Sequence, residues 1–466
     1  MEELFVYSDI MIKNTYSLKA LLVAVVTLAG GLAGVSCTAE EETRVVLGDE
    51  QFEEYLPLLE GRRVALFSNQ SGIVGDKVSG SKLADVMAKH GGCFRPEGND
   101  EELEEASMIQ FLEPSEPGGI IEYGPHVLDA LLEKGVDVRA IFSPEHGFRG
   151  KADAGELVDS SIDPETGVEI LSLYEKGSRI PGKEKMDKFD VLVVDIQDVG
   201  LRYYTYYITM HHLMEACAKY GKKMVVLDRP NPNGFYVDGA LLDMKYKSGI
   251  GWLPICTVHG LTLGEMARMI NGEGWLEGGG TCDLEVIPCR NYTHDTRYCL
   301  ILPPSPNLKD MKSVYLYSST CYFEGSIATP GRGTEFPFEV FGHPDLDASE
   351  YDFSFTPRSI PGAKSPRYQD QECHGRDLRK ASLETIWSRK IDLEPFIDAY
   401  NGLAAGDAFF GTNNHFELLT GQLYVREMIE NGESAEAISA KWSDDVRKYL
   451  EMRRQYLLYP ETQKLF

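Results

Sequence analysis

Four segments of the chain are short apolar, β-branched runs that end abruptly in polar clusters containing glycine or proline. They are VALFSNQSG (64–72), VRAIFSPEHG (138–147), VLVVDIQDVG (191–200) and MVVLDRPNP (224–232). Apolar runs of this length without polar alternation are typical of strands buried on both faces, as in a parallel sheet covered by helices. Helical patterns at 124–134 and 206–220 lie between them, so the sequence predicts a doubly wound α/β domain.

The polar clusters place chemically active side chains at the carboxyl ends of the four strands. In open α/β sheets, ligands bind in the crevice beyond these ends, so the clusters are predicted to converge on one crevice. The candidate residues in these clusters are Asn69, Glu145, His146, Arg149, Asp195, Asp198, Asp228, Arg229 and Asn231.

The order of predicted elements changes after about residue 275. Beyond it the pattern gives a strand at 284–288, a turn-rich segment at 334–342, and helices at 383–399 and 416–449. We therefore predict a sheet domain at 45–275 and a smaller α+β C-terminal domain at 276–466 whose edge completes the crevice. An acidic stretch near 87–123 is too long for an ordinary connection and is predicted to be an insertion.

Glu145 is a candidate for catalysis. Pro144 precedes it and Gly147 follows closely, so the backbone leaves the strand sharply and the side chain can point into the crevice. A partly desolvated carboxyl group at this place could have a raised pKa and act as a general acid. The alternative from the local sequence is a structural glutamate that caps the next helix or pairs with Arg149.

Further carboxylates and cations accompany Glu145. Asp195 and Asp198 flank one strand end and Asp228 follows another, where they could serve as acid and base or hydrogen-bond backbone amides. A guanidinium can bind a substrate carboxylate through two parallel hydrogen bonds, or it can form structural salt bridges with the aspartates. The arginines in question are Arg202, Arg229 and Arg332, and Tyr204 belongs to an aromatic run that could stack on sugars.

The sequence argues against two classes of partner. A formal net charge of −27 with no local basic patch excludes nucleic acid, whose phosphates such a chain would repel. The scattered histidines form no H-E-x-x-H or similar signature, so no catalytic metal site is predicted.

The N-terminus predicts export. Lys13 and Lys19 precede an apolar run at 20–35 that ends in Ser36 and Cys37, a pattern typical of a signal peptide over residues 1–37. Small residues before Cys37 indicate either a lipoprotein type, anchored through Cys37, or an ordinary cleaved signal peptide. The expected location is the periplasm or the membrane surface, with membrane contact only through that anchor. In an exported chain, cysteines can pair, and Cys282 with Cys289 is the best candidate for a disulfide.

Taken together, the motifs resemble one family. These motifs are SNQSG, FSPEHGFRG, DIQDVGLRYYTY, LDRPNPNG, VHGLTLGEMA, PPSPNL, FEGSIATPGRGTEFPFEVFG and RRQYLLYP. They resemble the bacterial exo-β-N-acetylmuramidases of glycoside hydrolase family 171, formerly a family of unknown function, from about residue 45 to the C-terminus. The stretch near 87–123 is longer than in the family pattern.

The resemblance implies a fold, an activity and site residues. It implies a Rossmann-like catalytic domain with a smaller C-terminal domain, and release of terminal N-acetylmuramic acid from the non-reducing end of peptidoglycan fragments without a cofactor. Glu145 of SPEHG would protonate the leaving oxygen, and one of Asp195, Asp198 and Asp228 would orient the acetamido group or an attacking water. Arg202 or Arg332 would bind the lactyl carboxylate. The expected substrate-binding residues are Asn69, His146, Arg149, Arg202, Tyr204, Arg229, Asn231, Glu324 and Arg332.

Two other functions fit parts of the sequence. A non-catalytic exported protein that binds cell-wall sugars would also need the crevice and the tyrosines, but it makes no demand on Glu145. A metal-dependent amidase or esterase of the cell wall would lose its activity with a chelator.

Overall fold

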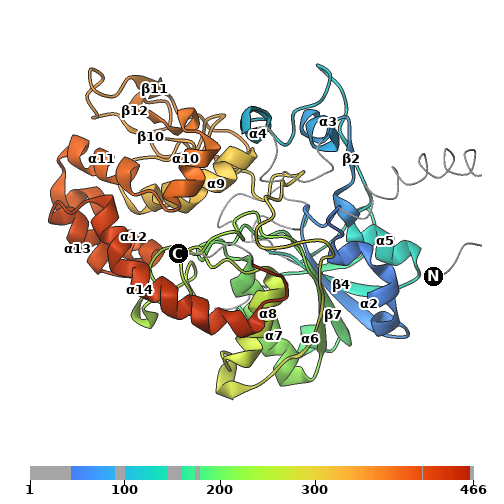
Figure 1. Cartoon of the computed structure of the whole chain (residues 1–466). Helices are drawn as coiled ribbons and strands as arrows, with labels where there is room; N and C mark the ends of the chain where they lie inside the picture. The colour runs from blue at the N-terminus through green and yellow to red at the C-terminus, as the bar shows by residue number, and fades with distance from the viewer. Residues whose placement is uncertain are drawn as a thin grey trace, which may run out of the picture. The chain divides into compact units, whose positions relative to one another are not determined.

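A seven-stranded sheet forms the centre of the N-terminal half of the chain in the computed structural model, which describes residues 44–89, 100–144, 148, 160–173, 179–411 and 413–461 (Figure 1). The strand order is β5-β6-β4-β1-β7-β8-β9, and every pairing except β5 with β6 is parallel. The strands are β1 (Arg63–Ser68), β4 (Asp137–Phe142), β5 (Ser161–Ile162), β6 (Glu169–Leu171), β7 (Val191–Asp195), β8 (Lys223–Leu227) and β9 (Asp283–Ile287). The four strands predicted from the apolar runs are thereby confirmed.

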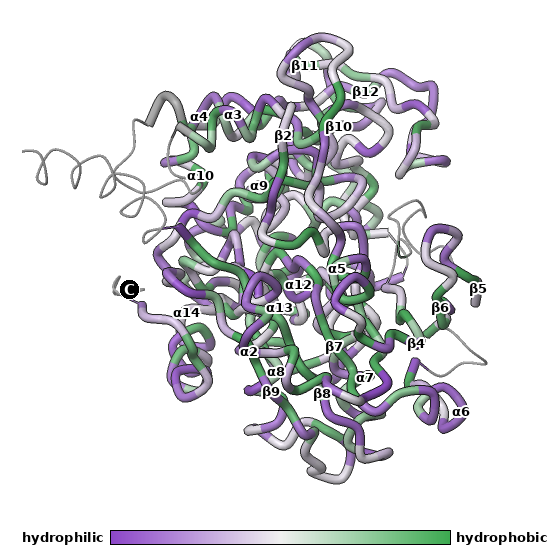
Figure 2. Tube along the Cα trace, turned by 90° about the vertical axis from the view of Figure 1, so that its right-hand side faces the viewer, coloured by the Kyte–Doolittle hydropathy of each residue, from purple (hydrophilic) through white to green (hydrophobic). Residues whose placement is uncertain are grey.

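Helices cover both faces of this sheet, because successive strand residues point to opposite sides. Leu66 packs on one face with Tyr55, whereas Phe67, the next residue, packs on the other face with Met214. The first face carries α2 (Phe52–Leu59) and α5 (Val127–Glu133), and the second carries α6 (Lys183–Met186), α7 (Tyr206–Tyr220) and α8 (Leu263–Gly272). The central strands are hydrophobic along most of their length (Figure 2), as burial on both faces requires.

A smaller C-terminal domain follows and combines a three-stranded antiparallel sheet with helices. The sheet has the order β10-β12-β11, with β10 (Val340–His343), β11 (Phe353–Phe355) and β12 (Cys373–Asp377). The helices are α9 (Met311–Thr320), the 3-10 helix η5 (Cys321–Gly325), α10 (Leu383–Arg389), α11 (Glu394–Leu403), α12 (His415–Thr420), α13 (Tyr424–Glu430) and α14 (Ala435–Arg453). Short elements of the N-terminal half are β2 (Val78–Ser79), α3 (Lys82–Lys89), α4 (Asp100–Ser107) and β3 (Glu122–Tyr123).

The structure differs from the prediction in three elements. The strand predicted at 284–288 for the C-terminal domain is β9, which pairs with β8 as the last strand of the central sheet. The helix predicted at 383–399 is broken at Lys390, whose φ of 59° is incompatible with a helix. The helix predicted at 416–449 is three helices, interrupted at Gly421 and Gly432, which also have positive φ. The division into domains at 275/276 stays a prediction.

The predicted disulfide between Cys282 and Cys289 is wrong. Both thiols are free and buried, and they flank β9 at opposite ends. The five residues of this extended strand alone span about 16 Å at ~3.3 Å per residue, whereas a disulfide needs Cα atoms within about 7 Å. The other described cysteines are free as well.

The predicted signal peptide, residues 1–37 with Cys37, lies outside the described residues. Within the ranges that the structure describes, no helix has the length and apolarity needed to cross a membrane.

Candidate active site

Two hollows adjoin each other, because they share three lining residues. The smaller, of about 170 Å³, is lined by the segment 203–206, which leads from β7 into α7. Asn69, directly after β1, donates a hydrogen bond from Nδ2 to the Tyr206 hydroxyl at 2.9 Å and so connects this hollow to the sheet. The larger, of about 550 Å³, is formed by loops of the C-terminal domain. Glu324, Arg332 and His415 line both hollows.

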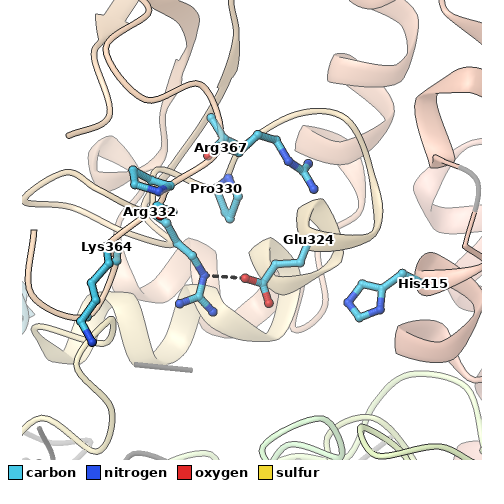
Figure 3. Close-up of a pocket in the computed structure, with 11 residues that line it drawn as sticks. Glu324, Pro330, Arg332, Lys364, Arg367 and His415 are labelled. Atoms are coloured by element: carbon cyan, nitrogen blue, oxygen red, sulfur yellow. Dashed lines mark hydrogen bonds and ion pairs between the residues drawn. The ribbon is translucent and has the colours of Figure 1, made fainter. Parts of the chain in front are cut away.

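The larger hollow carries mainly positive charge (Figure 3). Arg332, Lys364 and Arg367 line it, and Glu324 is its single acidic residue among those described. Arg367 is fixed by its Nη1, which donates to the carbonyl oxygens of Ser326 and Ala328. Although the net charge of the chain is −27, the lining of this hollow is basic, and a basic lining favours an anionic ligand.

Arg332 is presented by a tight turn. Gly331 and Gly333 on either side of it have φ values of 81° and 85°, which residues with a Cβ atom rarely adopt. The Thr334 hydroxyl closes the turn by donating to the carbonyl oxygen of Gly331 at 2.6 Å. The PGRGT sequence thus positions one guanidinium.

Arg332 and Glu324 form an ion pair where the two hollows meet. The Nε of Arg332 lies 2.5 Å from Oε1 of Glu324, and the guanidinium stacks 4.9 Å from the centre of the Phe338 ring. Burial opposes the charge of Arg332, but attraction to Glu324 outweighs it, so the pKa of Arg332 rises above its usual value. The ion pair uses only Nε, which leaves the terminal nitrogens of this side chain outside it.

The smaller hollow is mainly aromatic. Tyr203, Tyr204, Tyr206, Tyr317 and Phe338 line it. The hydroxyl groups of Tyr204 and Tyr206 both donate to the carbonyl oxygen of Pro304, at 2.6 and 3.3 Å. Rigid rings next to an ion pair form a surface suited to a ligand with both an apolar face and a charge, such as an acidic sugar.

Arg229 lies in a buried charge cluster that lines neither hollow. Its guanidinium contacts Asp49 at 2.6 Å, Asp195 at 2.6 Å and Asp76 at 3.2 Å, and the first two carboxylates are fully buried. Burial raises the pKa of Asp76 to about 6 and that of Asp49 well above its usual value, while Arg229 opposes both shifts. Asp195 and Arg229 therefore form a structural salt bridge, which was one of the two alternatives for the arginines.

Arg202 is fully buried, which corrects the expectation that it faces the crevice. Its terminal nitrogens donate to four backbone carbonyl oxygens, at distances of 2.7 to 3.0 Å. The acceptors are Ala240, Ile255, Leu419 and Thr420. Because Leu419 and Thr420 belong to α12, Arg202 joins the two halves of the chain and has no position from which to bind a substrate carboxylate.

Asp228 and Asn231 also serve the fold. Asp228 accepts hydrogen bonds from the Thr262 hydroxyl at 2.7 Å, the Gly264 amide at 2.9 Å and the Tyr459 hydroxyl at 2.5 Å, which fixes the start of α8. Burial raises the pKa of Asp228 to about 6. Asn231 packs against Gly200, where a Cβ atom would lie 2.3 Å from its Nδ2. Neither side chain lines the two hollows.

Asp198 is buried and forms no ion pair with an arginine or lysine among the described residues. Its Oδ1 accepts from the Gly200 amide at 2.7 Å, but its Oδ2 has no hydrogen-bond partner among the described residues. His259 Nε2 lies 4.0 Å from Oδ1, and burial lowers the pKa of His259 to about 3, so this ring is neutral. Burial correspondingly raises the pKa of Asp198 to about 7.

Asp198→Asn is expected to stabilise the protein at pH 8 by about 1 to 3 kcal/mol, since each pKa unit corresponds to about 1.4 kcal/mol. The folded-state pKa of Asp198 exceeds its unfolded value, so the wild type loses stability as pH rises from about 4 to 7, whereas asparagine does not titrate. Urea unfolding at pH 4.5 and pH 8 measures this, and the gain should vanish at the lower pH. A variant less stable than wild type at pH 8 would contradict it.

Comparison with known proteins assigns the chain to a family. Residues 115–312 match the family model described as "Exo-beta-N-acetylmuramidase NamZ, N-terminal", and residues 315–459 match its C-terminal counterpart. The peptidoglycan beta-N-acetylmuramidase NamZ of Bacillus subtilis strain 168 is 35% identical over 359 residues, which cover 74% of this chain and 85% of that protein. The chain belongs to the NamZ family.

Solved structures agree with this assignment. A DUF1343 family protein of Bacteroides fragilis NCTC 9343, with a crystal structure at 1.30 Å resolution, is 48% identical with a TM-score of 0.74. The alignment covers 90% of this chain and 99% of that one. A second DUF1343 family protein of the same strain is 26% identical with a TM-score of 0.65, over 90% of this chain and all of that one.

Three predicted site residues of this NamZ family member, Glu145, His146 and Arg149, lie outside the described residues. Ser143 and Pro144, the last described residues before Glu145, directly follow β4, which pairs with β1. Of the other predicted residues, Tyr204, Glu324 and Arg332 line the hollows, and Asn69 supports them through Tyr206.

Sequence reasoning missed three residues of the hollows. Lys364 and Arg367 lie in the loop between β11 and β12, and His415 begins α12. Loops have no periodicity, so their sequence gives no sign of which side chains face a ligand. The positive φ of Asn414, directly before His415, became visible only in the structure.

Proposed function

We propose that this chain is an exo-acting glycoside hydrolase that releases terminal N-acetylmuramic acid from the non-reducing end of peptidoglycan fragments. Membership of the NamZ family makes it a glycosidase. The observation that carries the choice of sugar is the Arg332–Glu324 pair at the junction of an aromatic and a basic hollow. The alternative of a non-catalytic sugar-binding protein has no feature of its own in its favour.

In this proposal Arg332 binds the lactyl carboxylate, the group that distinguishes muramic acid from glucosamine. Its terminal nitrogens can donate to both carboxylate oxygens while Nε stays on Glu324. Tyr204 and Tyr206 then line the space next to it, where the sugar ring would bind. Lys364 and Arg367 add positive charge in the larger hollow, which would also attract the carboxylates of a stem peptide.

The catalytic carboxylates follow from the same arrangement. We assign Glu145 as the general acid that protonates the leaving oxygen. Asp195, Asp198 and Asp228 line neither hollow, so we assign Glu324 as the group that orients the acetamido group or an attacking water. In substrate-assisted hydrolysis the 2-acetamido group of the sugar is the nucleophile. This mechanism needs a carboxylate that orients the acetamido group, in addition to the general acid.

Arg332→Gln is expected to raise KM for a muramic acid-terminated disaccharide by about 10- to 100-fold, since a hydrogen bond to a charged group contributes about 1.5 to 3 kcal/mol. Steady-state kinetics of sugar release measures the change. Arg358→Gln is the matched control, because Arg358 lies in the same region but is exposed and pairs with Asp370. Equal KM values for the two variants would contradict the assignment of Arg332.

Product analysis tests the proposed function itself. Fragments that end in muramic acid and fragments that end in N-acetylglucosamine are incubated with the full chain, and released sugars are separated by mass. We expect release from the first alone. Release from the second alone, or from neither, would overturn the proposal.

We also propose that the chain is exported and anchored through Cys37. Support comes only from the sequence of residues 1–37. Mass spectrometry of the protein from membranes tests this, with Cys37→Ser as the variant that should lose the lipid and leave the membrane fraction. An unmodified N-terminus before residue 37 would contradict export.

A further inference from the structure

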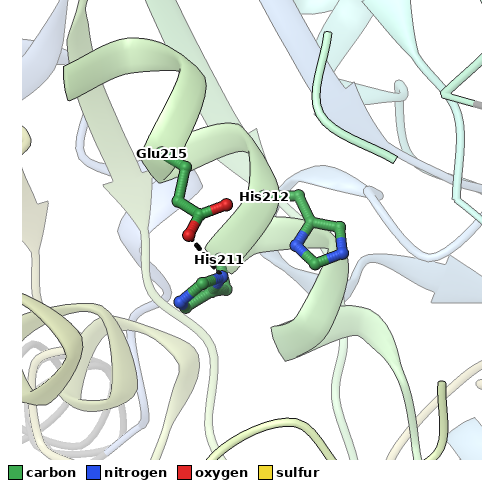
Figure 4. Close-up of side chains that lie close together, drawn as sticks. All are labelled: His211, His212 and Glu215. Carbon is green, nitrogen blue, oxygen red and sulfur yellow. Dashed lines mark ion pairs between the residues drawn. The ribbon is translucent and has the colours of Figure 1, made fainter. Parts of the chain in front are cut away.

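Three side chains of α7 with metal-binding groups converge away from the two hollows. One nitrogen or oxygen atom from each of His211, His212 and Glu215 lies within 4.8 Å of the others (Figure 4). Both imidazoles are buried and Glu215 is partly buried. The spacing of one and four residues along a helix places all three on neighbouring turns. The proposed function uses none of them.

The hydrogen bonds of His211 leave a lone pair that faces a carboxylate. Its Nε2 lies 3.1 Å from the carbonyl oxygen of Trp275, and a carbonyl can only accept, so Nε2 carries the hydrogen. Nδ1 then carries a lone pair and has no hydrogen-bond partner among the described residues. This nitrogen lies 3.9 Å from Oε1 of Glu215. Two electron-rich atoms therefore face each other with no proton between them.

His212 adds a second buried ring nitrogen to this cluster. His212 Nδ1 is also buried without a partner in the part of the chain that the structure describes, and its ring packs 4.7 Å from that of Trp252. Imidazole binds a metal through a ring nitrogen that carries a lone pair, and the contact of His211 Nε2 with Trp275 leaves such a lone pair on Nδ1.

We infer that His211, His212 and Glu215 bind a divalent transition metal, with zinc as the ion that best fits two imidazoles and a carboxylate. The hydrogen bond from His211 Nε2 to the Trp275 carbonyl is the outer contact that orients metal-binding histidines in other proteins. Zinc ligands lie about 3.4 Å apart, so rotations of the side chains bring the three donor atoms together. Water would complete the coordination.

The surroundings moderate the affinity of this site. The positive charges of Lys247, which lies above the Trp252 ring, and of Arg179 weaken the binding of a cation. The negative charge of Glu277, near Glu215, strengthens it. The metal would hold α7 to the segment around Trp275 through His211. Because α7 starts at Tyr206, which lines the smaller hollow, the site is placed to stabilise the helix that carries part of the active site.

Zinc titration of the full chain tests this inference. The protein is treated with a chelator, dialysed and titrated with zinc chloride by calorimetry, and its thermal unfolding is followed with and without the ion. We expect one tight zinc per chain and a rise in Tm. Glu215→Gln and His212→Gln should each raise the Kd for zinc by about 10- to 100-fold and abolish the rise in Tm.

Two controls keep the result independent of misfolding. In Glu215→Gln the new amide can donate to His211 Nδ1, so its Tm in metal-free buffer should not fall below that of wild type. Glu277→Gln removes a nearby charge but no ligand, and it should bind zinc nearly as tightly as wild type. Zinc binding weaker than about 10 µM, or binding that both ligand variants retain unchanged, would overturn the inference.

Discussion

Glu145→Gln is expected to lower kcat for a muramic acid-terminated disaccharide by about 10²- to 10⁴-fold, the contribution of a positioned general acid. Glutamine has nearly the same shape as a protonated glutamic acid but cannot deliver a proton. KM should therefore stay close to the wild-type value. Release of N-acetylmuramic acid, followed over a range of substrate concentrations, separates the two constants.

The nature of the leaving group distinguishes a general acid from other functions of Glu145. In an aryl glycoside of an acidic phenol, the phenolate leaving group departs without protonation. The decrease in kcat caused by Glu145→Gln should therefore be far smaller on this substrate. An equal loss on both substrates would indicate a nucleophile or a positioning residue instead. An unchanged kcat on both substrates would show that another carboxyl group is the general acid. Glu324 would be tested first, because it lines both hollows.

Glu184→Gln is the control for this experiment. Glu184 is exposed in α6 and lines neither hollow, so the same change of charge there should leave both constants unaltered. If neither the wild type nor Glu145→Gln releases sugar but both bind the disaccharide equally, the chain is a binding protein.

The sheet could be predicted because its signal is local. β1, β7 and β8 are mostly apolar and buried on both faces, which is the physical reason for that pattern, and β4 is apolar and buried in its second half. The strand that is β9 was predicted at 284–288 but placed in the C-terminal domain, because it follows the change in element order near residue 275; the structure pairs it with β8 at the edge of the central sheet.

The crevice residues were harder to predict because their partners are distant in sequence. Arg229 pairs with Asp49, 180 residues away, and Arg202 donates to Thr420, 218 residues away. Whether a polar side chain at a strand end faces a ligand or the interior depends on such partners, and one sequence does not show them. Arg332 lines both hollows, and the two glycines that form its turn are visible in the sequence, but the sequence does not show which groups the guanidinium faces.

Arg229→Met is expected to destabilise the fold by about 3 to 5 kcal/mol at pH 8, the usual cost of removing one partner from a buried ion pair. Methionine fills much of the space, but Asp49, Asp76 and Asp195 lose their shared cation. Urea unfolding measures the loss. Arg63→Met is the control, because Arg63 pairs with Asp190 at the surface, where loss of the pair should change stability little.

The pH dependence of this loss tests its cause. Without Arg229 the pKa values of Asp49 and Asp76 rise further above their unfolded values, so the folded variant holds protons that the unfolded chain releases. Its stability then falls as pH rises, and the difference from wild type should be smallest near pH 5 and largest at pH 8. A difference independent of pH would contradict a charge-based cause.

The same variant also decides between structure and substrate binding for Arg229. The charge cluster lines neither hollow, so at a pH where Arg229→Met is folded its KM should equal that of the wild type. A raised KM in that folded state would return Arg229 to the substrate-binding residues, since a purely structural cluster can lower the amount of folded enzyme but not the affinity of the fraction that is folded.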